Sequence, residues 1–519
     1  MTKLRYLMLA FALALAANLA QAQDSGPLLD LLVKKKILTD QEAEDVRAEL
    51  VRENASTPAG KFNLSTPIQE VRLYGDGRVR YALNEGRVAG GTDHGEADRF
   101  RYKFRLGMDV KLSDNWFFGL QLQAGANGRS ANITMGGVPV FNKASASTDT
   151  FVTAVDPKTV KATTAKAVTK VNFGDAVFVG QLYLKYSPWN WMSVEGGRIP
   201  NPFVGGNVGS SGGSLLVWDP DINPQGFAEQ FKYTATLLGG SRGGGFTKDG
   251  KAIAPMTSEG MTLDLFANFG QFVYEDVTEN NFNKAAGPAG EVSNKNDLWM
   301  LGFQVGAKAN FTKTTYLQVA PALYTYTGGG DSIHTAFNGD ATQVVVNKNA
   351  ETGLLTFNQT GVNNLAILEI PVEFGWTMWQ TPFKIFGEYD NNLDGGQRAA
   401  KAGHPDKHQN TAYSVGASAG QVKKKGDWEI KAWWQHVEQF SLDPNIIDDD
   451  NFDGHLNMQG YVIRASYAFT DAASFSLLYA KGARIDKSLG TGGGGGVLGS
   501  VGFPLDQAQL LFVDFNLKF

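Results

Sequence analysis

The last nine residues, Leu511 to Phe519, alternate between apolar and polar side chains with a period of two. Successive side chains of a β-strand point to opposite faces, so every second residue from Leu511 onward falls on one apolar face. The opposite face carries Asp514, Asn516 and Lys518. One face suits lipid and the other suits water, which is typical of a strand between a membrane and a wet lumen. The C-terminus is therefore predicted to be a transmembrane strand.

The N-terminus has the pattern of an exported protein. A basic region at Lys3 and Arg5 precedes an apolar run, Leu7 to Ala17, and a small-residue cleavage site, Ala20 to Ala22. We predict a signal peptide over residues 1–22 that is cut after its last residue. The alternative, a membrane anchor, is disfavoured because the apolar run is too short to span a bilayer. The chain has no cysteine, so neither disulfides nor a lipid-bearing thiol are expected.

The composition agrees with a barrel that crosses a membrane with strands. The chain contains 61 glycines and 33 phenylalanines, and 19% of its residues are charged. No long apolar stretch follows the signal peptide, and the mean hydropathy of -0.21 is that of a soluble protein. A transmembrane barrel fits both facts, because only every second strand residue needs to be apolar. The net charge of -5 disfavours nucleic acid as a partner.

Residues 23–66 are predicted to form a short helical segment and a linker. An apolar stretch from Leu28 to Val33 ends in three lysines, and Thr39 with Glu42 fits a capping box that starts a second helix. Helix-breaking residues follow from Ala55 onward. Because this segment precedes the barrel, we expect it to be periplasmic. It is either a solvated spacer or a short coiled-coil or envelope-docking element that helps oligomerisation.

From about residue 67 the hydrophobic pattern has a period of two. Between Phe100 and Leu112 the even-numbered positions are apolar and most odd-numbered ones are charged. Runs of ten or more residues let a tilted strand cross a bilayer, whereas strands of soluble sandwiches have about five or six. We predict an all-β fold, a transmembrane antiparallel β-barrel of about sixteen strands over residues 67–519. The expected strands are 71–83, 98–112, 115–126, 176–187, 190–199, 227–238, 261–270, 298–312, 315–326, 366–379, 382–392, 411–422, 427–439, 458–469, 473–483 and 508–519.

The expected connections alternate between tight turns and long Gly-, Asn- and Thr-rich loops. In outer-membrane barrels the periplasmic turns are short and the outer loops are long, and an even strand count returns both chain ends to the periplasm. Three features fit this scheme less well. Residues 239–260 are long where a short turn is expected, and Pro321 and Pro371 each remove a ladder hydrogen bond. The prolines indicate either bulges or a strand count that is wrong by two.

Charged residues collect on the inward faces of a few expected strands. In a closed ring of sixteen, strands eight apart face each other, so the second strand lies opposite the tenth. A basic wall opposite an acidic wall would create a transverse field that orients polar solutes. The alternative is that these charges solvate a wide lumen or pair locally. The basic wall consists of Arg78, Arg80, Arg99, Arg101, Lys103 and Arg105, and the acidic wall of Glu369, Glu373, Glu388 and Asp390.

Two motifs in the middle of the chain resemble a known family. Gly197–Phe203 (GRIPNPF) and Leu216–Gly226 (LVWDPDINPQG), together with the helical segment and the terminal Phe519, resemble the putative-porin family of Gram-negative bacteria. The terminal aromatic residue also resembles the C-terminal signature of bacterial outer-membrane barrels. The resemblance implies a passive channel for small hydrophilic solutes in the outer membrane, surrounded by lipid and lipopolysaccharide and commonly a homotrimer.

In general porins the third outer loop folds into the barrel, and the resemblance implies the same for the connection from Pro200 to Gln225. Its glycines permit the backbone conformations that a tight inward fold needs. Its acidic residues would add charge to the constriction. The alternative is an ordinary surface loop. The constriction residues expected from this motif are Arg198, Asn201, Asp219 and Asp221.

Evidence for a metal site or for catalysis is weaker. Residues 390–395 and 449–454 match the first half of a calcium loop, but their twelfth positions hold Lys401 and Gly460 instead of a carboxylate. No Ser or Asp stands in a spacing that ties it to His436 as a catalytic triad, so we expect no enzyme. We expect no cofactor other than calcium in the outer loops, for which the weak candidates are Asp449, Asn451 and Asp453.

The sequence thus predicts an outer-membrane channel for passive diffusion, with two alternatives. The first is a substrate-selective channel in which the ladder from Arg99 to Arg105 guides anions such as phosphate. The opposed carboxylates weigh against that alternative. The second is a structural protein that links the outer membrane to the cell wall through residues 27–53, with any pore incidental.

Overall fold

The chain divides into two compact units, Met1–Ile68 and Gln69–Phe519. The predicted signal peptide and most of the helical segment and linker lie outside the described residues. The computed structural model describes residues 39, 41, 42, 44, 46, 65–88, 94–125, 132–134, 148–155, 162–168, 176–203, 214–238, 260–275, 298–327, 346–348, 355–357, 364–401, 404–491 and 505–519.

The described part of the first unit contains the predicted capping box. The Glu42 backbone N–H donates to Thr39 Oγ1 (3.2 Å), and the Thr39 backbone N–H donates to Glu42 Oε2 (2.8 Å). These reciprocal bonds satisfy donors that the start of a helix leaves unpaired. Residues 41 and 42 are helical, as the capping box predicts.

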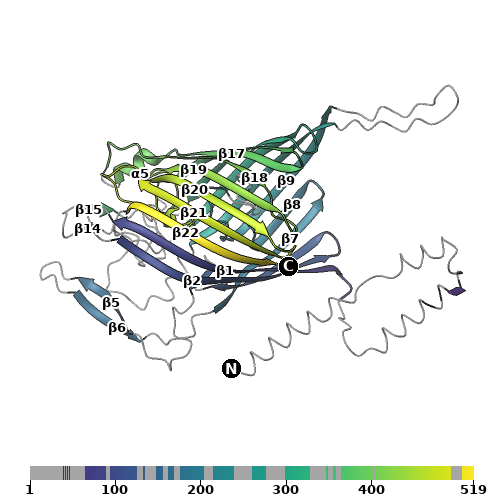
Figure 1. Cartoon of the computed structure of the whole chain (residues 1–519), viewed down its shortest axis with the longest axis horizontal. Coiled ribbons are helices and arrows are strands. Elements are labelled where there is room, and N and C mark those ends of the chain that lie inside the picture. The colour runs from purple at the N-terminus through teal and green to yellow at the C-terminus, as the bar shows by residue number, and fades with distance from the viewer. Residues whose placement is uncertain are drawn as a thin grey trace. The chain divides into compact units, whose positions relative to one another are not determined.

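The second unit is a closed antiparallel β-barrel (Figure 1). Each strand pairs with its neighbours in the chain, and the last strand pairs with the first from Asp76↔Lys518 to Val88↔Leu505, which closes the ring. The strands are β1 (Ile68–Val88), β2 (His94–Leu112), β3 (Trp116–Gly125), β4 (Asn132–Thr134), β7 (Ala176–Trp189), β8 (Met192–Arg198), β9 (Gln225–Leu238), β10 (Met261–Glu275), β11 (Leu298–Asn310), β12 (Tyr316–Val319), β13 (Ala322–Thr327), β16 (Ala366–Met378), β17 (Thr381–Asn392), β18 (Thr411–Gly420), β19 (Trp428–Val437), β20 (Met458–Ala468), β21 (Ala473–Arg484) and β22 (Leu505–Lys518).

These eighteen strands, all within the described residues, make sixteen crossings. β4 is a three-residue piece that pairs with β2 beyond the end of β3, and β12 and β13 are two halves of one crossing. Pro321 separates the halves, but the register against β16 runs on unchanged from Val319↔Val372 to Ala322↔Glu369. The prolines therefore mark neither a bulge nor a wrong strand count. They leave a gap in the hydrogen-bond ladder within one continuous strand.

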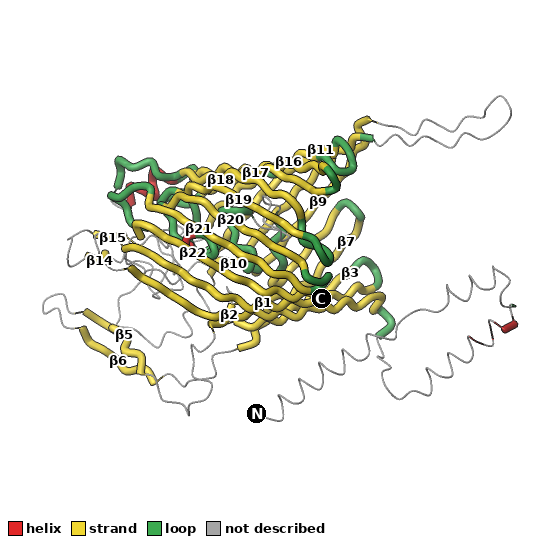
Figure 2. The backbone as a smooth tube through the Cα atoms, viewed as in Figure 1, coloured by secondary structure: helices red, strands yellow, loops and turns green. Residues whose placement is uncertain are grey.

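The connections between strands differ in length at the two ends of the barrel. The short ones, drawn in green at the right of Figure 2, include residues 113–115, 190–191, 379–380 and 469–472. The opposite end carries the longer connections, including those with the hairpins β5 (Thr148–Val155)–β6 (Ala162–Val168) and β14 (Val346–Lys348)–β15 (Leu355–Phe357), the helix α5 (Gly395–Lys401) and the 3-10 turn η1 (Phe452–Gly454). Residues 239–260 join β9 to β10 on the short-turn side, and all but the last lie outside the described residues.

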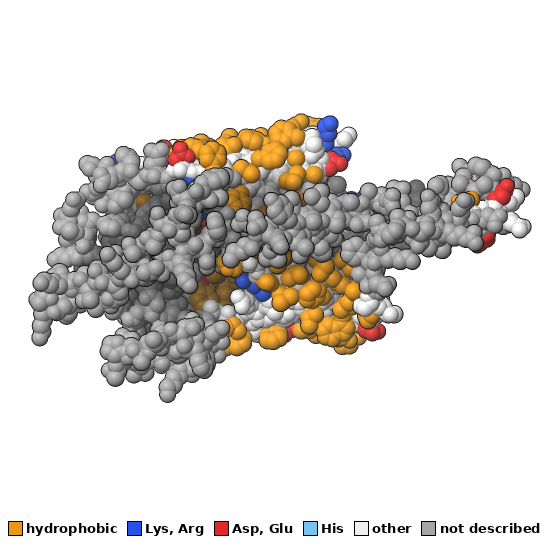
Figure 3. All heavy atoms as spheres, turned by 90° about the horizontal axis from the view of Figure 1, so that it is seen from below, with side chains coloured by type: hydrophobic (Ala, Val, Ile, Leu, Met, Phe, Trp, Pro, Cys, Tyr) orange, Lys and Arg blue, Asp and Glu red, His pale blue; other side chains and the backbone are white. Residues whose placement is uncertain are grey.

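The outer face of the barrel is apolar, as a lipid-facing surface requires. On β2, Phe100 and Phe104 are 55% and 44% exposed, whereas Arg101 and Lys103 on the inner face are 7% and 9% exposed. Hydrophobic side chains cover much of the described wall that is visible in Figure 3. Among the described residues, no helix is both long and apolar enough to cross a membrane. Exposed aromatic residues ring the short-turn end, as is typical of a membrane interface: Trp116, Trp189, Trp191, Trp379, Trp428, Tyr467, Phe469 and Phe519.

Two glycines face each other where the connection between β8 and β9 leaves the sheet. Gly197 and Gly226 are paired in the register, and both have positive φ angles, 126° and 149°. A Cβ atom at Gly226 would lie 2.1 Å from the backbone oxygen of Gln271. Only glycine fits such a position, so this pair lets the chain turn away from the wall at both ends of the connection.

We predict that Gly226→Ala lowers the yield of folded barrel, because the added methyl group strains the backbone and collides with β10. The measurement is the fraction of refolded protein that migrates as the compact, heat-modifiable form in gel electrophoresis. Gly396→Ala in α5 is the matched control, since a Cβ there meets no atom within 4 Å. An equal yield for the two variants would contradict the role assigned to Gly226.

Candidate functional site

The described part of the connection between β8 and β9 contacts two walls inside the barrel; we call this connection, residues 199–224, the crossing loop. Its residues 199–203 and 214–224 are described. On one side, the backbone N–H groups of Leu215 and Leu216 donate to the Glu388 carboxylate on β17 (2.8 and 3.3 Å). On the other side, Asp221 accepts a hydrogen bond from Lys103 on β2 (2.8 Å).

An aromatic cluster holds the middle of the crossing loop against a third stretch of wall. The rings of Phe203 and Trp218 lie 6.2 Å apart, and both contact Phe272 on β10 and Tyr324 on β13. Phe203, Trp218 and Tyr324 are at most 2% exposed. Large buried rings contribute strongly to packing, so this cluster also holds the loop against the wall.

The basic wall lies on the inner faces of β1 and β2, as predicted, and much of it is paired. Arg80 donates to Asp514 (2.7 Å) and to Asp450 (2.6 Å), and Arg78 lies 3.9 Å from Asp514. Arg105 donates to Asp76 (2.7 Å) and lies 3.3 Å from Asp221, which also binds Lys103.

Arg99 and Arg101 complete the basic wall on β2. Arg101 is 7% exposed, and Arg99 is half-buried. In the described part of the chain the Nε atom of each has no hydrogen-bond partner. The inner-loop carboxylates Asp449 and Asp453 act on Arg99 through their charge, and Asp450 lies near Arg101.

A second loop that sequence reasoning did not identify also folds into the barrel. It spans residues 438–457 between β19 and β20, and we call it the inner loop. Besides the Asp450–Arg80 pair, Asp453 accepts a hydrogen bond from Asn84 on β1 (3.1 Å), and Asp443 accepts one from Tyr326 on β13 (2.6 Å). The sequence did carry a signal, because apolar residues are unusual in an outer loop. The buried ones are Phe440, Leu442, Ile446, Ile447, Phe452 and Leu456.

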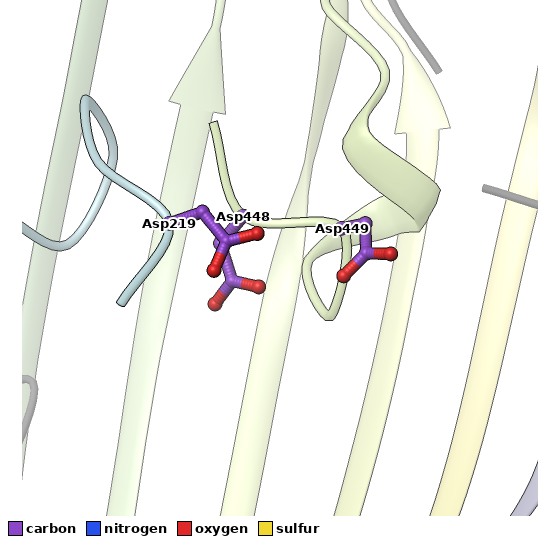
Figure 4. Close-up of side chains that lie close together, drawn as sticks. All are labelled: Asp219, Asp448 and Asp449. Atoms are coloured by element: carbon purple, nitrogen blue, oxygen red, sulfur yellow. The ribbon is translucent and has the colours of Figure 1, made fainter. Parts of the chain in front are cut away.

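The two infolded loops meet at a group of carboxylates (Figure 4). The Asp219 backbone N–H of the crossing loop donates to the Ile446 oxygen of the inner loop (2.6 Å). At this junction Asp219, Asp448 and Asp449 place carboxylate oxygens within 4.8 Å of one another. Burial, with the neighbouring charges of Asp450 and Asp449, raises the pKa of Asp448 to about 7. The junction thus changes its charge near neutral pH.

The charges of the walls fix the ionisation of the loop carboxylates that touch them. Burial opposes ionisation of Asp221, but the charges of Lys103 and Arg105 outweigh it and lower the pKa of Asp221 to about 2. Burial is likewise outweighed at Asp450, where Arg80 and Arg78 hold the pKa well below its usual range. Both carboxylates therefore stay ionised, and both ion pairs persist, over the whole physiological pH range.

The residues of the expected acidic wall lie on β16 and β17. Glu369 and Asp390 are direct partners in the register and are 0% exposed, and Glu388 is 4% exposed. Glu369 accepts a hydrogen bond from the Tyr324 hydroxyl (2.6 Å). Glu373 lies further along β16, where it accepts a hydrogen bond from Tyr316 and pairs with Lys384. Three of the four acidic residues are thus buried where the crossing loop docks.

The remaining residues from the sequence analysis are two expected constriction residues and the three calcium candidates. Arg198 ends β8 opposite Gln225, and Asn201 Oδ1 accepts a hydrogen bond from the Phe203 backbone N–H (3.0 Å). Of the calcium candidates, Asp449 lies in the junction, Asn451 Nδ2 donates to Asp448 (3.4 Å), and Asp453 binds β1 as described above. Calcium at these three residues stays a prediction.

A closed sixteen-stranded barrel with an apolar outer face and an infolded loop defines a porin-type β-barrel. The fold therefore points to a channel and not to an enzyme. Residues 162–388, somewhat less than half of the chain, match the model of a family described as "Putative porin". This match confirms the predicted resemblance to that family.

Solved structures that are similar to the chain include outer-membrane porins. A high-pH structure of Pseudomonas putida OprB has 12% identity and a TM-score of 0.39, over 86% of this chain and 94% of that one. A variant of the Rh. blastica porin has 10% identity and a TM-score of 0.36, over 87% of this chain and all of that one. No curated protein sequence matches the chain significantly.

We predict that Asp221→Asn destabilises the folded barrel by about 3–5 kcal/mol, because it leaves the buried Lys103 ammonium without its partner. Adding Lys103→Met should recover part of this loss, since the uncompensated charge is then gone. Urea unfolding of the refolded protein in lipid vesicles measures both effects. Lys407→Met, at the more exposed Lys407–Asp486 pair, should change little. Strictly additive effects of Asp221→Asn and Lys103→Met would contradict the direct pair.

We predict that docking of the inner loop weakens as pH rises from about 4 to about 7. The pKa of Asp448 is raised in the folded state, so its contribution is fully present below the unfolded value and is lost as pH rises through about 7. Hydrogen exchange of peptides from residues 438–457, corrected for intrinsic rates, should show less protection at pH 8 than at pH 5. Asp448→Asn should remove the difference. Peptides from the turn 421–427 serve as an internal control, and an equal pH response there would contradict the assignment to Asp448.

Proposed function

We propose that the protein is an outer-membrane porin that lets small hydrophilic solutes and ions diffuse passively through a water-filled channel. The observation that carries the proposal is a loop that crosses the lumen of a closed barrel and is tied to charged walls on both sides. A sixteen-stranded barrel is wide enough to leave an aqueous channel, and an infolded loop narrows it. The apolar outer face with its aromatic ring supports a place in a lipid bilayer.

We further propose the orientation and the surroundings of the barrel. The short turns and residues 23–66 would face the periplasm, and the longer connections the outside, where lipopolysaccharide surrounds them. The signal peptide would direct export in a Gram-negative cell. The family resemblance supports a homotrimer.

The burial of the acidic wall favours a second candidate, a channel selective for anions. Glu369, Glu388 and Asp390 are at most 4% exposed, so water and solutes have little access to them. Arg99 is half-buried, and its Nε atom has no hydrogen-bond partner among the described residues. A basic surface attracts anions to the extent that its acidic neighbours, here Asp449 and Asp453 of the inner loop beside Arg99, do not offset its charge. This arrangement weakens the transverse-field hypothesis, in which both walls face the solute.

The experiment is the single-channel conductance and reversal potential of the refolded protein in a planar bilayer across a salt gradient. Large ohmic steps with weak selectivity support the general porin, and a strong anion preference with block by phosphate supports the second candidate. Arg99→Glu combined with Arg101→Glu should move the reversal potential toward cations.

The control for this charge reversal is Lys481→Glu combined with Lys487→Glu, which makes the same charge change at two exposed positions. The control should leave the reversal potential nearly unchanged, because exposed charges outside the lumen are screened by salt. An equal shift in both variants would contradict the placement of the arginines in the ion path. A folded barrel that gives no steps would contradict both channel functions.

A further inference from the structure

Three carboxyl groups on neighbouring strands form a tight buried group beneath the crossing loop. Glu369 on β16 and Glu388 and Asp390 on β17 place oxygen atoms within 4.8 Å of one another. Hydrogen bonds from the rest of the chain reach only some of the oxygen atoms of these three carboxyl groups. Glu388 accepts two backbone N–H donors of the crossing loop, and Glu369 Oε2 accepts the Tyr324 hydroxyl.

The other oxygen atoms of the group have no partner outside it. Glu369 Oε1 and both carboxylate oxygens of Asp390 are buried and accept no hydrogen bond from a donor outside the group. Asp390 and Glu388 lie close enough to hydrogen-bond to each other when one of them is protonated. An independent polar group at the same place is also unsatisfied. Ser414 on β18 is the direct register partner of Glu388, is 4% exposed, and its hydroxyl has no hydrogen-bond partner. Buried polar atoms are normally satisfied, so these oxygens indicate either protons shared within the group or a bound cation.

The charge of the group indicates what kind of ligand it is. Within the described part of the chain, the charges that act on these carboxylates are those of one another, and no Lys, Arg or His compensates them. Uncompensated buried carboxylates are costly, and either protons or a cation must offset them. The two backbone N–H donors to Glu388 favour its ionised form. Its neighbours then form an oxygen-rich pocket with excess negative charge.

We propose that Glu369, Glu388 and Asp390 bind one divalent cation of the calcium class. Carboxylate oxygens in a flexible set of six or more, with hydroxyl groups nearby, are the ligands that Ca²⁺ prefers. The Ser214 hydroxyl of the crossing loop lies within hydrogen-bond reach of Glu369 and Glu388 and can donate to one of them. The cation thus fastens this loop to the barrel wall. The site is distinct from the calcium candidates in the inner loop, and it does not depend on what passes through the channel.

The test is terbium luminescence of the refolded full-length protein in detergent, with excitation of the aromatic residues. Tyr324 donates to Glu369, and the Trp218 ring lies 5.9 Å from the Tyr324 ring, so a Tb³⁺ ion in this site has sensitisers close by. We expect wild-type protein to give a signal that Ca²⁺ displaces. Asp390→Asn should weaken the affinity by about tenfold or more, because affinity falls with the number of charged ligands.

Two variants test the location of the site. Glu373→Gln is the matched control, because it removes a carboxylate from the same face of β16 that already has Lys384 as its partner, and it should keep the affinity. Asp448→Asn should also keep it, which separates this site from the junction of the two loops. Equal affinity of Asp390→Asn and wild type, or loss of binding in Asp448→Asn, would overturn the proposal.

A direct measurement on the unmodified protein keeps the proposal testable if the first variant fails to fold. Heat-modifiable migration in gel electrophoresis shows whether a variant has folded. If Asp390→Asn does not fold, Glu369→Gln takes its place in the terbium measurement. Calorimetric titration with Ca²⁺ should show a site in wild-type protein that is kept in Asp448→Asn. The absence of calcium binding at neutral pH would mean that the three carboxyl groups share protons instead, and would overturn the proposal.

Discussion

The tie between the crossing loop and the two charged walls is the interaction on which the rest of the interior depends. Sixteen strands enclose a space that wall side chains alone do not fill, so charged groups on the walls would otherwise face a wide aqueous lumen. The crossing loop supplies backbone donors to Glu388 at one wall and the Asp221 carboxylate to Lys103 at the other. Lys103 and Glu388 can be buried on these walls because the loop brings partners to them.

The same logic extends from the crossing loop to the inner loop. Asp450 compensates Arg80, which is 1% exposed, and Asp443 accepts hydrogen bonds from Tyr274 and Tyr326. Burying an unpaired charge costs free energy of desolvation. These contacts therefore hold the inner loop in one specific position against the wall. After this pairing Arg99 stays partly exposed, whereas Arg101 is 7% exposed. Under the proposed channel function, Arg99 is therefore the more accessible of the two to a solute.

The strands could be predicted from the sequence because each needs only a local pattern. A period of two located all sixteen crossings to within a few residues, and the same parity placed Arg101 and Glu369 on the inner face. Because strands eight apart face each other in a closed ring of sixteen, the strand order also predicted that β2 lies opposite β16. Even the break at Pro321 was visible, although its effect on the register could not be decided, because pairing depends on both neighbouring strands.

The partners of the inward charges could not be predicted from the sequence. The Asp450–Arg80 pair joins residues 370 positions apart, and no local pattern announces such a contact. The inner loop was missed for a related reason: the connection 438–457 was considered for calcium ligands, whereas its apolar residues indicate burial. The group formed by Glu369, Glu388 and Asp390 was predicted as an exposed wall, because the sequence does not show that the crossing loop covers it.

The most direct test of this account is the single-channel conductance of a variant that loses both anchors of the crossing loop, Asp221→Asn combined with Glu388→Gln. If the loop is held across the lumen by these contacts, the variant should fold, as judged by its heat-modifiable migration. It should also pass larger and more variable currents than the wild type under the same conditions. A folded variant with unchanged conductance would contradict the central claim that the tie between loop and walls determines the channel.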